Sequence, residues 1–226
     1  MKNRYERNMT ALSAAENERL KDFKVCVVGC GGLGGYVIES LGRLGIGHIT
    51  AIDGDVFQEN NLNRQLLSDE GSLGMSKAEA AFERMRKVNA DVSVTAVKKY
   101  VTGENSEEML KGHDIVVDAL DNVASRLVIE EAARKLNVPL VHGAIAGWYG
   151  QVSVIGPENP IFDKLYHGAT DRGIENELGN LPFTAAVTAS VQAAEAVKVL
   201  LGKGEPLTGK LLTIDLLSSD FEVFEI

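Results

Sequence analysis

The chain of 226 residues is predicted to be an α/β protein, with a mostly parallel, twisted sheet, helices on both faces and an antiparallel extension at the C-terminus. Strand-like apolar runs alternate with helical patterns up to residue 145, the order typical of βαβ units. A glycine-rich loop follows the first of these runs and opens the first helix. After residue 145 strand-like runs are joined by a single helix, which favours antiparallel pairing.

Five strands are expected in the parallel part of the sheet. They are "KVCVVG" (24–29), "HITAI" (48–52), "VSVTAV" (92–97), "HDIVVDAL" (113–120) and "PLVHGAI" (139–145). The first is a continuous apolar run, as expected of a strand buried on both faces of its sheet.

Helices are expected between these strands. Residues 33–44 form the first, and Gly45 ends it. Its apolar residues recur at helical spacing: Leu33, Val37, Ile38, Leu41 and Leu44. The second covers 76–89, with Ser76 as N-cap and Glu79 three positions on, the pattern of a capping box. The third covers 124–137.

The antiparallel extension is expected from "GQVSVI" (150–155), "GKLLTID" (209–215) and "FEVFEI" (221–226). An alanine-rich helix, 183–202, lies between them and stops at Gly202; it is expected to pack in the core, with a dimer contact as the sharper alternative. We expect one domain over residues 1–226, with a helical arm at 1–24 and a crossover loop at 156–182. The loop has no sustained periodicity, which fits a surface loop or a substrate-guiding segment.

Composition excludes several classes of protein. The net charge of −9 and the pI near 5.0 argue against a broad nucleic-acid-binding face, which needs clustered cations. No apolar run approaches the length of a membrane span, and the charged N-terminus lacks the core of a signal peptide, so a cytoplasmic protein is expected. Cys26 and Cys30 are too few for a disulfide framework or a four-cysteine zinc site.

The loop "GCGGLGG" predicts a Rossmann-like nucleotide site. Gly29, Gly31 and Gly34 satisfy G-x-G-x-x-G, and Gly32 adds further freedom for backbone N–H groups to approach phosphate. Asp53 ends the second predicted strand, where an acid can bind the ribose of NAD or of ATP. Asp55 fits turn stabilisation as well as a ligand role.

The loop between that strand and the next helix is unusually long. "DGDVFQENNLNRQ" (53–65) exceeds the usual two to six residues. It carries Arg64, and Lys77 opens the helix that follows. Cleavage of a triphosphate develops more charge than an NAD site must balance, so this pair favours ATP over NAD. A lysine present for solubility alone would be unremarkable in isolation.

Acidic residues follow the fourth strand, in "DALDN". Asp121 is the better candidate for a Mg²⁺ ligand, because Asp118 still lies within the strand pattern. Asn122 could bind the nucleotide or cap the next helix. Arg126, one turn further, faces the site or pairs with Glu130.

Other polar and aromatic residues have no clear chemical partner in the sequence. The histidines, His48, His113, His142 and His167, are more consistent with structural than with catalytic roles. Trp148 and Tyr149 could line a substrate groove or only pack there.

The set "GCGGLG", "DGD", "NLNRQ", "GMSKA" and "DALDN" resembles the activating enzymes of ubiquitin-like proteins, particularly the bacterial MoeB/ThiF/HesA adenylyltransferases. The similarity covers nearly the whole chain, from "NRYERN" to "QAAEAVKVLLG". It implies ATP-dependent adenylation of the C-terminal glycine of a ubiquitin-like sulfur carrier ending in Gly-Gly, with a separate sulfur donor protein. Many relatives carry two CxxC pairs for zinc and some a cysteine in the crossover; neither occurs here, so no zinc and no covalent cysteine intermediate are expected.

The resemblance also implies a role for each matching residue. Asp53 would bind ribose, Arg64 and Lys77 the phosphates, and Asp121 the Mg²⁺ ion. Arg7 of "RYER" would act as an arginine finger in the neighbouring subunit, which implies a homodimer; Asn8 replaces the usual glutamine beside it. The expected nucleotide-binding set is Gly29, Gly31, Gly32, Gly34, Asp53, Asp55, Asn61, Arg64, Gln65, Lys77, Asp121, Asn122 and Arg126, and the catalytic set is Arg7, Arg64, Lys77 and Asp121.

Three other functions remain open at this point. Within the same superfamily, related enzymes adenylate a modified base of tRNA, although the acidic chain speaks against this. An NAD-dependent oxidoreductase would need a catalytic acid–base pair that the sequence does not show. A catalytically silent binding module would not need Arg7, Arg64, Lys77 and Asp121 together.

Overall fold

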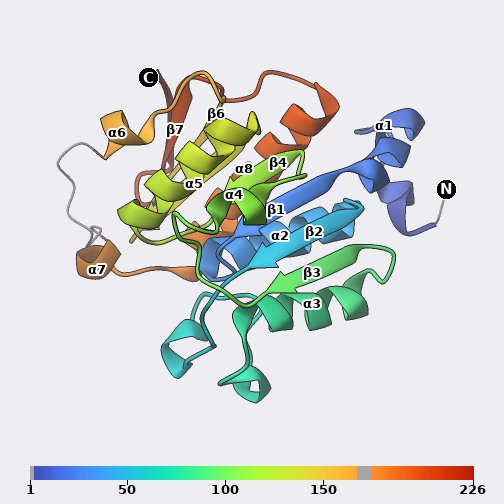
Figure 1. Ribbon diagram of the computed structural model, residues 1–226, viewed down its shortest axis with the longest axis horizontal. Helices are drawn as coiled ribbons and strands as arrows, with labels where there is room; N and C mark the ends of the chain where they lie inside the picture. Colours follow the sequence, from blue (N-terminus) through green and yellow to red (C-terminus); the bar gives the residue numbers. More distant parts are fainter. Residues whose placement is uncertain (1–2, 167–174) are drawn as a thin grey trace.

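The computed structural model describes residues 3–166 and 175–226, and its centre is one sheet (Figure 1). The strands are β1 (Lys24–Val28), β2 (His48–Ile52), β3 (Ser93–Val97), β4 (Ile115–Asp118), β5 (Leu140–Ala146), β6 (Tyr149–Ile155), β7 (Lys210–Asp215) and β8 (Asp220–Glu225). Their order is β3-β2-β1-β4-β5-β6-β7-β8. The first five are parallel and the pairs β5–β6, β6–β7 and β7–β8 antiparallel, which confirms the predicted fold class.

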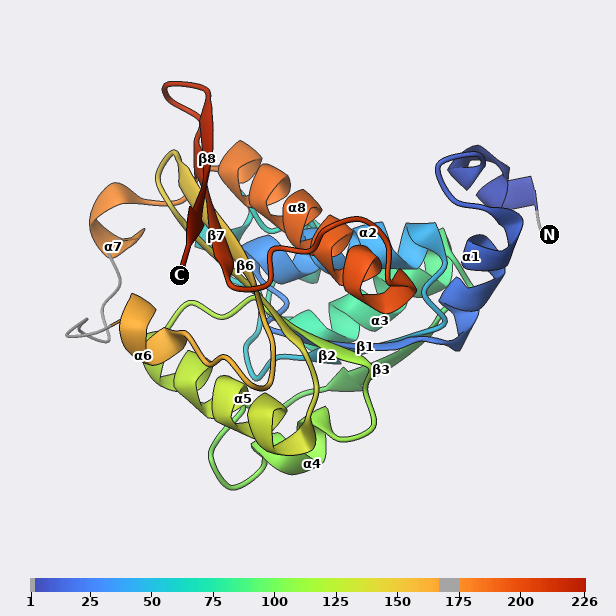
Figure 2. The same ribbon diagram turned by 90° about the horizontal axis from the view of Figure 1, so that it is seen from above.

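Helices cover both faces of this sheet (Figure 2). One face carries α2 (Gly32–Leu44), α3 (Lys77–Val88) and α8 (Pro182–Leu201), and the other α4 (Ser106–Leu110), α5 (Val123–Leu136) and α6 (Phe162–Leu165). The short helix α7 (Glu175–Leu178) precedes α8. Successive residues of β1 alternate between the two cores, Val25 with the first and Cys26 with the second, so β1 is buried on both faces as predicted.

Helix α8 is a core helix, although it is as long and apolar as a membrane-spanning helix. It is long and apolar enough to cross a membrane by length and composition, which qualifies the expectation that no run approaches that length. Yet it packs on β5, β6 and α2. A Cβ atom at Gly143 of β5 would lie 2.3 Å from Gln192, and one at Gly150 of β6 would lie 2.1 Å from Thr188. Glycine in the strands therefore lets α8 sit directly on the sheet as a core helix.

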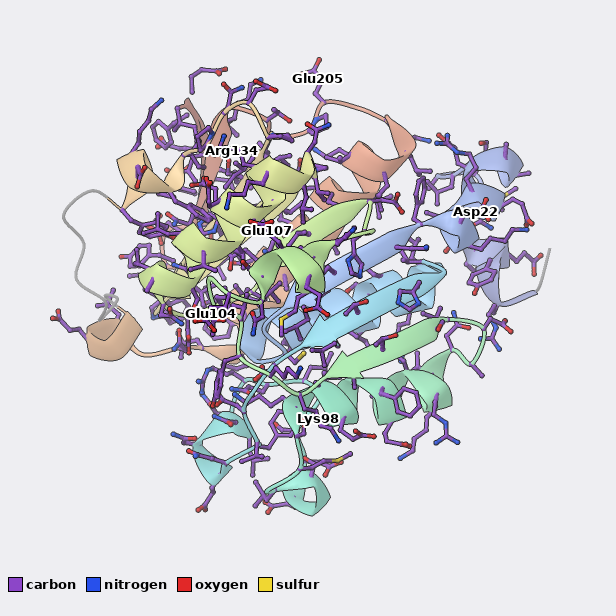
Figure 3. All side chains as sticks on the ribbon, in the orientation of Figure 1. Asp22, Lys98, Glu104, Glu107, Arg134 and Glu205 are labelled. Atoms are coloured by element: carbon purple, nitrogen blue, oxygen red, sulfur yellow. The ribbon has the colours of Figure 1, made fainter. Side chains whose placement is uncertain are left out.

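The helix ends follow the predictions in part. Gly45 and Gly202 end α2 and α8 in the left-handed conformation, as expected. Ser76 is the N-cap residue of α3, as predicted, but its hydroxyl makes no capping bond. The predicted capping box is absent, and the Glu79 carboxylate accepts from Lys98, which is labelled in Figure 3. The backbone there pairs with an upstream segment, because Ser76 bridges Val56 in antiparallel fashion. This tertiary pairing sets the helix start without a side-chain cap.

The N-terminal arm lies at the amino ends of the strands, on the right in Figure 1. It comprises the 3-10 helix η1 (Asn3–Asn8) and α1 (Ala14–Arg19). The Asn8 amide donates to the carbonyl of Leu44, the last residue of α2, over 3.2 Å. The arm is thus attached to the end of α2 that is remote from the glycine loop.

Candidate functional site

An open cleft lies at the carboxyl ends of β1, β2, β4 and β5. It brings together eleven of the thirteen predicted nucleotide-binding residues, namely Gly29, Gly31, Gly32, Asp53, Asp55, Arg64, Gln65, Lys77, Asp121, Asn122 and Arg126. Gly34 and Asn61 do not line it. The carboxyl edge of a parallel sheet is where open α/β folds bind ligands.

The glycine loop, residues 29–34, fits closely between strand and helix. Gly29 has φ +96°, and a Cβ there would lie 2.4 Å from the carbonyl oxygen of Ala119. A Cβ at Gly34 would lie 1.8 Å from the carbonyl oxygen of Gly29. Helix α2 begins at Gly32 without a side-chain cap, so its first N–H groups are available to an anion in the cleft.

Asp53 fastens this loop to β2. Its Oδ2 accepts from the N–H of Cys30 (2.7 Å) and its Oδ1 from the N–H of Asp55 (2.8 Å). Burial raises the pKa of Asp53, although these two backbone bonds act in the opposite direction. A carboxylate has about four acceptor sites, so Asp53 retains acceptors for ribose hydroxyls.

The long loop 53–65 delivers two side chains to the glycine loop. The Arg64 stem lies over Gly32, where a Cβ would lie 3.8 Å from its Cγ, and Gln65 lies against Gly31. The Arg64 guanidinium donates to the carbonyl of Asn60 and the amide oxygen of Asn63, both at 2.9 Å. Burial lowers the pKa of Arg64, and nearby Asp121 acts in the opposite direction.

Asn61 has a structural place in that loop rather than in the cleft. Its side-chain oxygen accepts from the N–H of Gln58 (3.0 Å) at the start of the 3-10 helix η3 (Glu59–Asn61). The side-chain oxygen of Gln65, by contrast, is buried and has no hydrogen-bond partner. A bound ligand could supply that missing donor.

Lys77 and Asp55 form an ion pair at the cleft, with 3.2 Å between Nζ and Oδ2. Lys77 is buried, and the Tyr100 hydroxyl also bonds Asp55. Burial raises the pKa of Asp55, but the Tyr100 bond and the Lys77 charge outweigh it, so the pKa is lowered. In this arrangement a carboxylate holds the Lys77 ammonium at the place where an anionic ligand can compete for it.

Asp121 stands exposed at the edge of the cleft, beyond the end of β4. Its Oδ1 is 3.4 Å from the amide nitrogen of Asn122. Asn122 caps α5, because its side-chain oxygen accepts from the N–H of Ser125 over 2.8 Å. In the part of the chain that the structure describes there is no group of three or more His, Cys, Asp or Glu suited to a metal. A single exposed carboxylate can contribute one ligand to a cation, with phosphates and water as the other ligands.

Arg126 faces the cleft, but its guanidinium bonds the protein. The Nε atom lies 3.4 Å from Asp118 Oδ2, Nη1 donates to the Tyr166 hydroxyl (2.8 Å) and Nη2 to the carbonyl of Leu120 (2.6 Å). The predicted alternative, pairing with Glu130, does not occur: the Glu130 carboxylate accepts two backbone N–H groups of the crossover instead.

Several lining residues carry no signal in the sequence. They are Lys99, Tyr100 and Val101 after β3, Ser125 of α5, Ala144 and Ile145 of β5, and Asn180 before α8. Trp148 and Tyr149 do not line the cleft; the Trp148 ring packs on Phe183 at 4.8 Å. His48 and His113 bond the hydroxyl of Thr50, and His167 lies outside the described residues.

Arg7 is remote from the cleft of its own chain. It precedes Asn8, which is bonded to the last residue of α2, whereas the cleft lies at the first residue of that helix. The 13 residues of α2 span about 20 Å, more than an arginine side chain can cover. Arg7 is also exposed, so it is free to contact another subunit.

Comparison with known proteins identifies the family and the fold. The profile of the ThiF family matches residues 5–226. The chain is 37% identical to a SAMP-activating enzyme E1 of Haloferax volcanii, over 97% of this chain and 83% of that protein. It is 38% identical to a sulfur carrier protein adenylyltransferase of Thermus thermophilus, over 96% and 84%. The fold matches that of Escherichia coli MccB with ATP, with a TM-score of 0.84 and 22% identity over 100% of this chain and 71% of that one.

Proposed function

This chain belongs to the ThiF family, and from that premise we propose that it adenylates the C-terminal glycine of a ubiquitin-like sulfur-carrier protein with ATP. The reaction makes it an adenylyltransferase. Relatives with that activity match nearly the whole chain, so an NAD-dependent oxidoreductase is no longer supported.

One observation supports this function more than any other. The loop 53–65 lays Arg64 over the glycine loop, while Lys77 and Asp121 border the same cleft. Two cationic side chains and the helix N-terminus of α2 supply positive charge for a triphosphate, and an exposed carboxylate stands beside them. A catalytically silent binding module would not need this set.

Each side chain has a role in that reaction. Asp53 binds the ribose hydroxyls, the N–H groups of the glycine loop approach the phosphates, and Arg64 and Lys77 neutralise them. Asp121 holds a Mg²⁺ ion through one carboxylate; when bound, the ion neutralises phosphate charge and orients the leaving group. Lys77 exchanges Asp55 for phosphate, since the two anions compete for one ammonium group.

The chemistry needs alignment rather than a base. The carrier's terminal carboxylate is already ionised, and it attacks the α-phosphorus of ATP while the bond to the β-phosphate oxygen breaks. The products are the acyl-adenylate and pyrophosphate. Catalysis then rests on positioning and on neutralising charge that develops on the phosphates.

The location of Arg7 supports a homodimer with composite sites. Its own cleft is about one helix length away, so Arg7 can reach phosphates only in a second copy of the chain. The arginine would add positive charge to phosphates that Arg64 and Lys77 contact from the first copy.

The product is expected to leave without a covalent bond to the enzyme. Residues 156–182 contain no cysteine, and Cys26 and Cys30 are fully buried. A separate sulfur donor protein therefore acts on the acyl-adenylate. Two free thiols without a disulfide fit a cytoplasmic protein, and the net charge of −9 speaks against tRNA as substrate.

Pyrophosphate exchange into ATP tests this function. With a carrier ending in Gly-Gly the wild-type protein should catalyse exchange, and Lys77→Ala or Asp121→Ala should lower it about 100-fold or more. Lys98→Ala is a matched control, since Lys98 is an exposed lysine paired with Glu79. Exchange that does not need a carrier, or that survives in Asp121→Ala, contradicts the proposal.

A further inference from the structure

Five polar side chains meet beneath the cleft, from five different segments of the chain. They are Asp118 of β4, Arg126 of α5, His142 of β5, Gln151 of β6 and Tyr166, the residue after α6, and we call them the Tyr166 cluster. Asp118 and His142 are fully buried, and Arg126 is 7% exposed. His142, Gln151 and Tyr166 do not line the cleft.

Gln151 Nε2 lies 3.2 Å from both the Tyr166 hydroxyl and His142 Nε2, and the hydrogen bonds among the other four side chains run in one direction. His142 Nδ1 lies 2.7 Å from Asp118 Oδ2, and a carboxylate only accepts, so the imidazole proton is on Nδ1. The Nε2 atom then accepts from the Tyr166 hydroxyl at 3.1 Å. The hydroxyl oxygen accepts in turn from Arg126 Nη1 at 2.8 Å. The ion pair of Arg126 with Asp118 closes a ring of four side chains.

This ring holds the backbone of the loop that follows β4. Asp118 Oδ1 accepts from the N–H of Leu120 at 3.0 Å, and Arg126 Nη2 donates to the carbonyl of Leu120 at 2.6 Å. Both backbone groups of Leu120 are therefore bound by members of the ring. Asp121 is the next residue, and its exposed side chain has little contact of its own, so its position depends on this backbone.

The charges of the ring are paired internally, although the Nε–H of Arg126 makes no hydrogen bond. The buried carboxylate of Asp118 matches the Arg126 guanidinium, and two of the Arg126 nitrogens donate within the protein. Arg126 is thus less suited than Arg64 to neutralise phosphate directly. Arg126 instead lines the cleft and binds the backbone of Leu120.

We propose that Tyr166 is a positioning residue of the adenylation site: through Arg126, His142 and Asp118 it fixes the loop that carries Asp121. The proposal rests on the function proposed above and extends the nucleotide site to Tyr166, the residue after α6. Tyr166 contacts no substrate atom in this role. It acts by holding a guanidinium and an imidazole that in turn hold Leu120.

The variant Tyr166→Phe tests the proposal, because it removes the hydroxyl and keeps the ring that packs on Phe162 at 5.6 Å. Amide hydrogen exchange at Leu120 in the free protein should become faster. The Mg²⁺ concentration that half-saturates binding of a non-hydrolysable ATP analogue, measured by calorimetry, should rise about tenfold, as when an outer partner of a metal ligand is lost. Arg126→Lys, which cannot span Leu120 and Tyr166 together, should show the same shift.

Two controls separate positioning from stability. Tyr36→Phe removes a hydroxyl from α2 on the other face of the sheet and should leave the Mg²⁺ dependence unchanged. Ile38→Val loosens the buried core on the α2 face of the sheet and should lower the melting temperature without shifting the Mg²⁺ dependence. If Tyr166→Phe binds the analogue with wild-type Mg²⁺ dependence, the proposal is overturned. Absence of exchange in the wild-type protein with every carrier would instead overturn the proposed function, since analogue binding does not require a carrier.

Discussion

Two glycines of the glycine loop differ in the space that surrounds a Cβ atom at their position. A Cβ at Gly34 would lie 1.8 Å from the carbonyl oxygen of Gly29, which belongs to the backbone and cannot turn away. A Cβ at Gly32 would have nothing closer than 3.8 Å. A close backbone contact therefore excludes a side chain at residue 34, whereas residue 32 has room for a methyl group.

Alanine substitutions at these two glycines should therefore differ in their effect on the free energy of unfolding. Gly34→Ala is expected to lower the free energy of unfolding by about 3 kcal/mol, because the strand and helix must move apart. Gly32→Ala should change it by less than about 0.5 kcal/mol. Urea unfolding of both variants measures the difference, and equal losses would contradict the assigned contacts.

The residues of the site divide into those that sequence reasoning found and those that it missed. Asp53 and Asp121 follow strands, Lys77 opens a helix and Arg64 lies in a long polar loop between them, so their place at the cleft could be predicted. Tyr100 and Asn180 could not, because each reaches the cleft through a contact between segments distant in the chain. Their residue types carry no local signal of that contact.

At the scale of elements, helix starts in this fold have two different causes. The side chain of Asn122 caps α5, whereas the start of α3 is set by backbone pairing and the buried Ser76 hydroxyl has no partner. Capping chemistry therefore stabilises α5 but not α3.

The two caps should respond differently to alanine. Asn122→Ala is expected to cost about 1 kcal/mol of stability. Ser76→Ala should cost less than about 0.5 kcal/mol, since no hydrogen bond is lost. Chemical unfolding of the two single variants checks this, and a larger loss at Ser76 would show that its hydroxyl has a partner after all.

A buried carboxylate joins the helices α2 and α3. Glu39 of α2 accepts from Arg84 of α3 through two bonds of 2.9 Å and from Arg43 at 2.8 Å. Burial raises the pKa of Glu39, but the two arginines outweigh it, and the folded-state pKa is below 4.5. The ionised form is therefore the one that stabilises the fold.

The stability that Glu39 contributes should depend on pH in a defined direction. It is fully present above pH 4.5, the unfolded-state value, and is lost as the pH falls through the lower folded-state pKa. At pH 7 Glu39→Gln should lower the free energy of unfolding by about 1–3 kcal/mol, and the wild-type and variant curves should converge in acid. Glu83→Gln, which removes an exposed pair with Arg86, is the control and should change little.

Most elements were predictable because their patterns are local. Apolar runs, the period-two alternation of β3 and the helical spacing of apolar residues located the strands and the long helices of the described residues, and glycines marked the ends of α2 and α8. The packing of α8 directly on β5 and β6 was not predictable. It requires glycine at 143 and 150, which leaves room for the side chains of Gln192 and Thr188. That complementarity exists only once the strands and the helix are placed together.

At the scale of the whole molecule, Arg7 and the cleft lie at opposite edges of the sheet. In a composite active site, Lys77 belongs to the subunit that supplies the cleft and Arg7 to its partner. Arg7→Ala and Lys77→Ala therefore remove groups that different subunits contribute to one site. Mixed dimers of the two variants then contain one intact site, formed by the cleft of the Arg7→Ala chain and the Arg7 of the other chain.

Mixing should therefore restore activity that neither variant has alone. Random exchange of subunits is expected to return up to about a quarter of the wild-type pyrophosphate exchange, since half of the dimers are mixed and each has one of two sites intact. Lys77→Ala mixed with Asp121→Ala should restore nothing, because both changes damage the same cleft. Full activity of Arg7→Ala alone would exclude a role for the arginine.

The buried cysteines determine what becomes of the activated carrier. Burial raises the pKa of both Cys26 and Cys30, so neither presents a thiolate to an acyl group. In the proposed reaction the activated carboxylate then exists only as a mixed anhydride with AMP, for which water competes with the intended acceptor. The yield then depends on the rate of hydrolysis relative to the rate of transfer to the acceptor. The longer the cleft protects the anhydride from water, the more carrier is converted for each ATP consumed.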